Sequence, residues 1–119
     1  MGEFRCMERR EKIILEKVLS EIEIAGKIIG TSSLPEFLSD ELLKRAACMT
    51  VINIGELVKN LPTAFRMAYP AVPWKEIAGF RDIAAHKYQT LRMEDVFETI
   101  TVDFPALYQD IKDILIQET

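Results

Sequence analysis

The octapeptide RDIAAHKY, residues 81–88, gathers side chains that could act together on a phosphate and a proton. Arg81 supplies a permanent cation whose planar fork of donors matches phosphate oxygens. His86 is the only histidine of the chain, and an imidazole can take up and release a proton near neutral pH. Tyr88 adds a hydroxyl group. These groups suffice for metal-free RNA cleavage, in which a base takes the ribose 2′-OH proton and a cation stabilises the charge that develops on the phosphate.

The octapeptide is predicted to lie at the end of a helix, and helix geometry limits how its side chains could meet. At about 100° per residue, Arg81 and Tyr88 fall about 20° apart, whereas Arg81 and His86 fall about 140° apart. A straight helix therefore does not bring Arg81 and His86 to one phosphate. Either the helix loosens before His86, or two copies of the chain supply the groups to a shared cleft. Asp82, one turn before His86, could orient the imidazole, but it would also repel a phosphate.

Several candidate residues have a structural interpretation beside the functional one. A lone histidine such as His86 near a helix end is more often a cap or a surface residue than a catalyst. Glu56 could face the cleft or pair with a cation of a second copy, and a structural role fits it equally well. Trp74 could stack on a base, although an anchor for its own helix is the stronger expectation. Lys87 and Arg92 could hold an RNA backbone or be ordinary solvated charges.

Length and composition indicate one globular domain over residues 1–119. Of these residues 49% are apolar and 29% are charged, so the chain can bury a core without disulfides or a metal. No window approaches the roughly 18 uncharged apolar residues of a membrane span, and no secretory signal is recognisable. Cys6 and Cys48 are predicted to be free thiols of a cytoplasmic protein. The first six residues, MGEFRC, are interpreted as a vector remnant or a disordered end, with Met7 as the native start.

Charge is distributed unevenly along the chain. The net charge of −4 argues against a protein that coats nucleic acid non-specifically. Residues 66–92 nevertheless carry five basic and two acidic side chains, whereas residues 93–119 carry one basic and seven acidic ones. The positive balance therefore surrounds the octapeptide, where it suits a phosphate.

Apolar periodicity predicts helices in the N-terminal half. Residues 8–29 form an amphipathic helix with apolar residues at three- and four-residue steps. A second helix begins either at Ser33, which has capping-box spacing to Glu36, or at Ser39 and Asp40. The apolar positions of the first helix are Ile14, Val18, Ile22, Ala25 and Ile29.

Residues 42–61 are apolar almost all round and are too long for a strand. Such a helix must be buried on more than one side, so it belongs at the centre of a bundle or in a subunit interface. Gly55 would allow another helix to approach it closely.

Prolines divide the C-terminal half of the chain. Pro73 suits the first turn of the helix that leads into the octapeptide. An apolar stripe from Val96 to Ile114 predicts the last helix, in which Pro105 should cause a kink or a break near residue 104. The fold class is therefore all-α, with four or five helices packed as a bundle.

The match to a known motif extends beyond single residues. RDIAAHKY fits the pattern of Arg, four residues, His, any residue and Tyr, and it resembles the motif of HEPN-domain ribonucleases, among them the HepT-type toxins. IGELVKNLP, YPAVPWKEIAGFRDIAAHKY and VFETITVDFPALYQDI resemble the same family in the order of its elements. The similarity covers roughly residues 8–116.

This resemblance implies an antiparallel HEPN-type bundle that dimerises, with the two motifs facing a shared cleft. It implies a toxin with metal-independent endoribonuclease activity, in which Arg81 and His86 are catalytic and neither a metal nor another cofactor is needed. It also implies a cognate antitoxin, a minimal nucleotidyltransferase of the MntA type that transfers AMP to Tyr88. Structured RNA such as tRNA is the expected substrate.

The chain departs from the family pattern at two places. Asp82 follows the motif arginine where a neutral polar residue is common, and the first acidic residues after the motif tyrosine are Glu94 and Asp95. Asp82, Glu56 and Lys87 are the residues expected to support the site. The alternative function is a non-catalytic helical subunit that binds a nucleotide or the nucleotidyltransferase through the same cleft.

Overall fold

Helix α1 (Arg9–Ile29) buries the apolar stripe that its sequence repeats at three- and four-residue steps. The computed structural model describes residues 7–117, so the interpretation of residues 1–6 lies outside the described part of the chain. Glu8 is the N-cap of α1, and its backbone N–H donates to Oε1 of Glu11 over 3.1 Å. The helix ends at Gly30, whose φ of 54° lies in the left-handed region that favours glycine. The predicted helix 8–29 is therefore confirmed.

Both candidate starts of the second helix are used. Ser33 caps the short helix α2 (Leu34–Leu38), and its hydroxyl oxygen accepts the N–H of Glu36. Asp40 caps α3 (Glu41–Lys59), where its Oδ1 accepts two backbone N–H groups, each over 3.1 Å. Two capping signals close together in the sequence therefore mark two successive helices.

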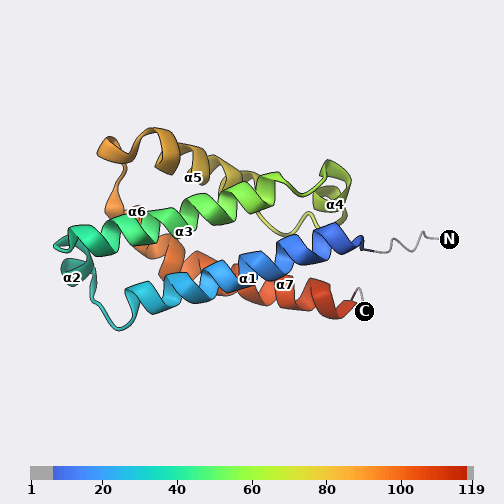
Figure 1. Ribbon diagram of the computed structural model, residues 1–119, viewed down its shortest axis with the longest axis horizontal. Coiled ribbons are helices and arrows are strands. Elements are labelled where there is room, and N and C mark those ends of the chain that lie inside the picture. The colour runs from blue at the N-terminus through green and yellow to red at the C-terminus, as the bar shows by residue number, and fades with distance from the viewer. Residues whose placement is uncertain (1–6, 118–119) are drawn as a thin grey trace.

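Helix α3 lies between α1 and α5 (Trp74–His86), as its apolar character predicted. Helix α7 (Phe104–Gln117) also packs against α1. Successive long helices run in opposite directions (Figure 1), so the described residues form an antiparallel all-α bundle and the predicted fold class is confirmed. Within residues 7–117, no helix is both long enough and apolar enough to span a membrane.

Trp74 anchors the start of α5. It is only 5% exposed, and its indole N–H donates to the backbone oxygen of Tyr69 over 3.0 Å. Its ring also lies against Phe65 of the short helix α4 (Thr63–Ala68), with the ring centroids 6.2 Å apart. The anchoring role preferred from the sequence is confirmed, because a buried indole cannot stack on a base.

The predicted break near residue 104 takes the form of a wider helical turn. Helix α6 (Met93–Glu98) continues into the π-helical segment η2 (Thr99–Asp103), which leads directly into α7. The N–H of Phe104 donates to the oxygen of Thr99, five residues earlier. Pro105 has no N–H to give to the preceding turn, so the α-helical bonding pattern is interrupted there.

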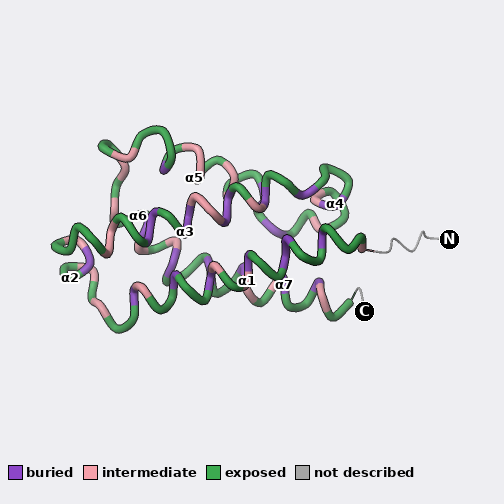
Figure 2. The backbone as a smooth tube through the Cα atoms, in the orientation of Figure 1, coloured by how far each residue is buried: buried purple, intermediate pink, exposed green. Residues whose placement is uncertain are grey.

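Helix α5 forms the outer edge of the bundle. Figure 2 shows it mostly in the colours of exposed and intermediate residues, and only Trp74 and Ala84 of this helix are buried. Ile83 is 45% exposed. The helix that carries the motif therefore packs on α3 with one face and leaves apolar side chains uncovered on the other.

The close approach of α5 to α3 should make Gly55 intolerant of a side chain. A β-carbon at Gly55 would overlap Cβ and Cγ of Arg81 and lie 3.2 Å from the backbone oxygen of Ile77. We expect Gly55→Ala to lower the free energy of unfolding by about 1–3 kcal/mol, because the two helices must separate. Urea denaturation followed by circular dichroism would measure the change.

Gly26→Ala is the matched control, because Gly26 lies inside α1 and a β-carbon there meets nothing within 4 Å. This substitution should raise the free energy of unfolding by about 0.5–1 kcal/mol, since alanine favours a helix over glycine. Equal effects of the two substitutions would contradict the close contact at Gly55.

Candidate active site at the end of α5

Arg81 is paired with two carboxylates, one on α3 and one on α5 itself. Its Nη2 lies 3.0 Å from Oε1 of Glu56, and its Nη1 lies 3.1 Å from Oδ1 of Asp82. The side chain is 20% exposed, and its buried Nε has no hydrogen-bond partner among residues 7–117. Glu56 thus pairs with a cation of its own chain. Because a guanidinium has five N–H donors, these two ion pairs still leave donors for a phosphate.

Asp82 is engaged by two cations and not by the histidine. Its Oδ1 accepts from Nζ of Lys59 over 3.0 Å as well as from Arg81. The hydrogen bond from Lys59, followed by that from Arg81, lowers the pKa of this carboxyl group. The contact with His86 expected from one-turn spacing is not formed, because the carboxylate points toward α3. Lys59, which the sequence did not single out, therefore belongs to the same charge cluster.

His86 is the last residue of α5, and it is exposed to solvent. Its side chain has no hydrogen bond or ion pair within residues 7–117. The helix is regular up to this point, since the N–H of Lys87 still donates to the oxygen of Ile83 over 2.8 Å. The helix does not loosen before His86, so Arg81 and His86 stay about 140° apart around its axis. One copy of the chain does not bring them to a common point.

Tyr88 lies in a separate turn beyond the helix. Lys87 has φ −133° and ends α5, and Tyr88 begins the 3-10 turn η1 (Tyr88–Thr90). The expectation that Arg81 and Tyr88 share one helix face is therefore wrong. The hydroxyl of Tyr88 donates to Oε2 of Glu41 over 3.2 Å, and the guanidinium of Arg45 lies 5.2 Å from the ring centroid.

Glu41, Lys44 and Arg45 form a cluster around Tyr88 that the sequence did not reveal. Glu41 pairs with Lys44 over 3.3 Å and with Arg45 over 2.9 Å. The hydrogen bond from Lys44 is the largest cause of the lowered pKa of Glu41. Burial, and then the charge and hydrogen bond of Glu41, raise the pKa of Tyr88. The only sequence signal for this cluster is the i,i+3 and i,i+4 spacing of its charged residues. Such spacing is common on helices, so it does not single out a site.

The other candidates show no comparable arrangement. Lys87 is exposed and has no ion pair among the described residues. Cys48 is a buried free thiol, and burial with the nearby charge of Glu41 raises its pKa to about 11. Within residues 7–117, no group of three or more His, Cys, Asp or Glu side chains is placed to hold a metal ion.

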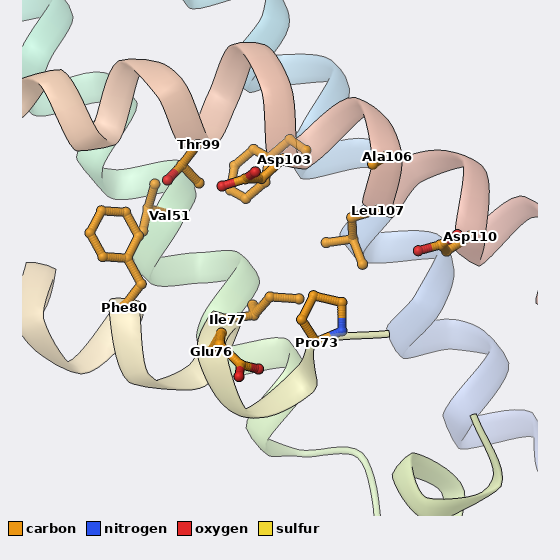
Figure 3. A pocket seen from close by; sticks show the side chains of 11 residues that line it. Val51, Pro73, Glu76, Ile77, Phe80, Thr99, Asp103, Ala106, Leu107 and Asp110 are labelled. Carbon is orange, nitrogen blue, oxygen red and sulfur yellow. The ribbon is translucent and has the colours of Figure 1, made fainter. Parts of the chain in front are cut away.

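A cavity of about 320 Å³ lies on a different part of α5, between that helix and η2–α7. Figure 3 shows its apolar side chains, with the carboxylates of Glu76, Asp103 and Asp110 among them. No cation and no residue of the RDIAAHKY motif lines it. An anionic ligand is therefore disfavoured in this cavity, and it is separate from the candidate active site.

The bundle and its site define an all-α protein with a cationic, histidine-bearing motif at the edge helix. The sequence profile of the family described as "Ribonuclease HepT-like" matches residues 18–114. The chain belongs to this family. No solved protein structure matches the chain.

Named relatives agree with this assignment. A protein of Caldanaerobacter subterraneus subsp. tengcongensis named "Putative RNase" is 40% identical over 87% of this chain and 93% of its own length. A protein of Thermococcus cleftensis named "Probable ribonuclease HepT" is 31% identical over 85% of this chain and 92% of its own length. A "Putative RNase" of Methanocaldococcus jannaschii is 34% identical over 92% of this chain and 91% of its own length.

Proposed function

We propose that this chain is an endoribonuclease that cleaves RNA without a metal ion, with Arg81 and His86 as catalytic residues. The observation that carries the proposal is the placement of both side chains on α5, in a member of the HepT-like ribonuclease family. Arg81 is pre-positioned on α3 by Glu56 and Asp82, whereas His86 is exposed and free to meet a substrate. A fixed cation and an accessible imidazole are the two groups that this reaction needs.

In the proposed reaction His86 accepts the proton of a ribose 2′-OH, and the 2′-oxygen attacks the adjacent phosphorus. Arg81 stabilises the negative charge that builds up on the phosphate oxygens. The bond from phosphorus to the 5′-oxygen then breaks, the departing oxygen takes up a proton from water, and His86 releases the proton it accepted to the solvent. The products are a 2′,3′-cyclic phosphate on one fragment and a 5′-hydroxyl on the other.

The site is proposed to form between two copies of the chain. Arg81 and His86 point in directions about 140° apart on a regular helix, so a second copy is needed to bring one of each to a single phosphate. The uncovered face of α5, with Ile83 45% exposed, offers apolar surface for such a contact. A two-fold dimer through this face would place two equivalent clefts side by side.

Control of the enzyme is proposed to act through Tyr88, as the toxin half of a toxin–antitoxin pair. A cognate nucleotidyltransferase of the MntA type would transfer AMP from ATP to the phenolic oxygen and release pyrophosphate. The raised pKa of Tyr88 keeps its hydroxyl protonated, and Glu41 already accepts that proton in a hydrogen bond. The added phosphate would lie two residues from His86, where it would compete with RNA for the same cations.

Cleavage of RNA in EDTA tests the catalytic proposal. Unmodified wild-type protein should cut RNA such as total tRNA and leave 2′,3′-cyclic phosphate ends. Arg81→Ala and His86→Ala should each reduce the rate by about 10²–10⁴-fold, the usual cost of losing a catalytic acid–base or electrostatic group. Lys75→Ala is the matched control, because Lys75 is an exposed cation at the other end of α5, and it should retain the wild-type rate.

The cleavage proposal fails if wild-type protein, shown by intact mass to carry no adduct, leaves all these RNAs intact. The non-catalytic nucleotide- or partner-binding function would then be the better explanation of the motif.

Mixing two inactive variants tests the shared cleft. Arg81→Ala and His86→Ala, co-expressed with different tags and purified through both, should recover part of the cleavage activity. In such a mixed dimer one cleft combines the intact Arg81 of one copy with the intact His86 of the other. The same variants purified separately provide the baseline. If the mixed dimer is no more active than these variants, both groups of a working site come from one copy.

Intact-mass spectrometry tests the modification of Tyr88. Co-expression with the nucleotidyltransferase encoded beside a gene of this family should add one or more AMP units and abolish RNA cleavage. Tyr88→Phe should prevent the addition. Tyr108→Phe is the control, because the Tyr108 hydroxyl also donates to a carboxylate, Glu23, over 2.7 Å but lies on α7. Modification of Tyr88→Phe, or none of the wild type, would rule out this form of control.

A further inference from the structure

A second cationic feature lies between the N-terminal part of α1 and the C-terminal turn of α3. The two helices pack together there at the same end of the bundle (Figure 1), and an open groove of about 610 Å³ runs between them. Among the described residues, its lining contains three cations and no carboxylate, although the chain as a whole has a net charge of −4. The lining residues are Arg9, Arg10, Ile13, Ile14, Lys17, Leu57 and Asn60.

Within residues 7–117, no carboxylate pairs with the cations of this groove. Arg9, Arg10 and Lys17 are exposed, and none of them has an ion pair within residues 7–117. At the motif, Arg81 and the neighbouring Lys59 are both paired with carboxylates, which leaves Lys87 as the one motif cation without an ion pair within residues 7–117. The groove therefore attracts an anion at longer range than the motif does.

The spacing of the cations follows one side of α1. Arg10 and Lys17 are seven residues apart, which places them about 20° apart around the axis and about 10 Å apart along it. Arg9 flanks Arg10 at the start of the helix. Beyond Lys17 the next carboxylate on this side is Glu21, which accepts a hydrogen bond from Asn53 over 3.4 Å. Glu16, seven residues after Arg9, borders the row on its other side. Such a row fits successive phosphates of an extended strand better than a single small anion.

We propose that this groove binds the phosphate backbone of the RNA substrate, an inference that rests on the ribonuclease function proposed above. The last turn of α3 connects the groove to the motif: Leu57 and Asn60 line the groove, whereas Glu56 holds Arg81. A strand that crosses this turn reaches the motif from the groove. The cavity with Glu76 and its acidic neighbours lies elsewhere on α5 and repels such a strand.

The groove is suited to bind the sugar–phosphate backbone of RNA and not to recognise particular bases. Its apolar lining is aliphatic, formed by Ile13, Ile14 and Leu57, and no aromatic side chain among residues 7–117 lines it to stack on a base. Contacts between cations and phosphates fix the position of a nucleic acid without reading its bases. Proteins that hold single strands through stacked bases rely on aromatic platforms, which this groove lacks.

RNA binding by a non-cleaving protein tests the groove. In a His86→Ala background, fluorescence anisotropy would follow a labelled single-stranded oligoribonucleotide, with total tRNA as competitor. A single-stranded contact contributes about 0.7 to the slope of log affinity against log salt, so Arg9→Ala, Arg10→Ala and Lys17→Ala together should reduce that slope by about 2. At about 0.1 M salt, binding should weaken at least about tenfold.

The matched control removes three other exposed cations through Lys27→Ala, Lys75→Ala and Lys112→Ala, which gives the same net charge. This variant should keep nearly the wild-type slope, because its charges lie outside the groove. Circular dichroism should show that both variants remain folded. With His86 restored, the groove variant should raise KM for RNA and leave kcat close to the wild-type value, because the reacting groups are intact.

The outcomes distinguish failure of the groove proposal from failure of the proposed ribonuclease function. If wild-type protein cleaves RNA and the groove variant binds as well as the control, the groove proposal is wrong and the function stands. If the groove variant changes only the oligomeric state, measured by sedimentation, the groove is a contact between protein copies and not an RNA site. If wild-type protein neither binds nor cleaves RNA, both proposals fail together.

Discussion

The geometry of the motif depends on the close contact between α5 and α3 at Gly55. Because Gly55 has no side chain, the β-carbon of Arg81 can lie directly over α3, and its guanidinium then reaches Glu56 over 3.0 Å. Gly55 thus leaves space for the side chain of Arg81, and the adjacent Glu56 binds its guanidinium. A catalytic cation must be fixed before the substrate arrives, since its alignment in the transition state would otherwise cost entropy. The packing of two helices therefore sets the electrostatics of the site.

A second contact fixes the far end of the same helix pair. Helix α3 begins at Glu41, and the Tyr88 hydroxyl and the Arg45 guanidinium join the turn after α5 to that first part of α3. His86 lies between this contact and the one at Arg81, so its backbone is held from both sides while its ring stays exposed. Any group attached to the oxygen of Tyr88 must break its hydrogen bond to Glu41. A modification there would consequently act on His86 through the loss of this tether as well as through its charge.

The sequence predicted the helices better than the contacts between them. Periodicity and the capping residues Ser33 and Asp40 located the helices because these signals are local, and the apolar character of α3 placed it at the centre. Residue type and spacing also identified RDIAAHKY as the candidate site. Its relation to the rest of the chain was not predictable, since the contact of Tyr88 with Glu41 joins residues 47 positions apart. The prediction that Arg81 and Tyr88 share a helix face is wrong for a local reason. Helix α5 ends at His86, and Lys87 leaves the helical conformation with a φ of −133°.

The charges suited to attract RNA and the groups proposed for catalysis lie on different parts of the chain. At the motif, Arg81 and Lys59 are balanced by Glu56 and Asp82, so this cluster carries little net charge and acts mainly at contact distance. Salt screens exposed charges beyond a Debye length of about 8–10 Å, and a neutral cluster draws an anion over a still shorter range. An acidic chain that acts on RNA as proposed gains from uncompensated cations elsewhere, and the groove beginning at Arg9 has three that lack an ion pair within residues 7–117. Under the two proposals, capture of the strand and alignment of the scissile phosphate belong to different residues, and each could change without loss of the other.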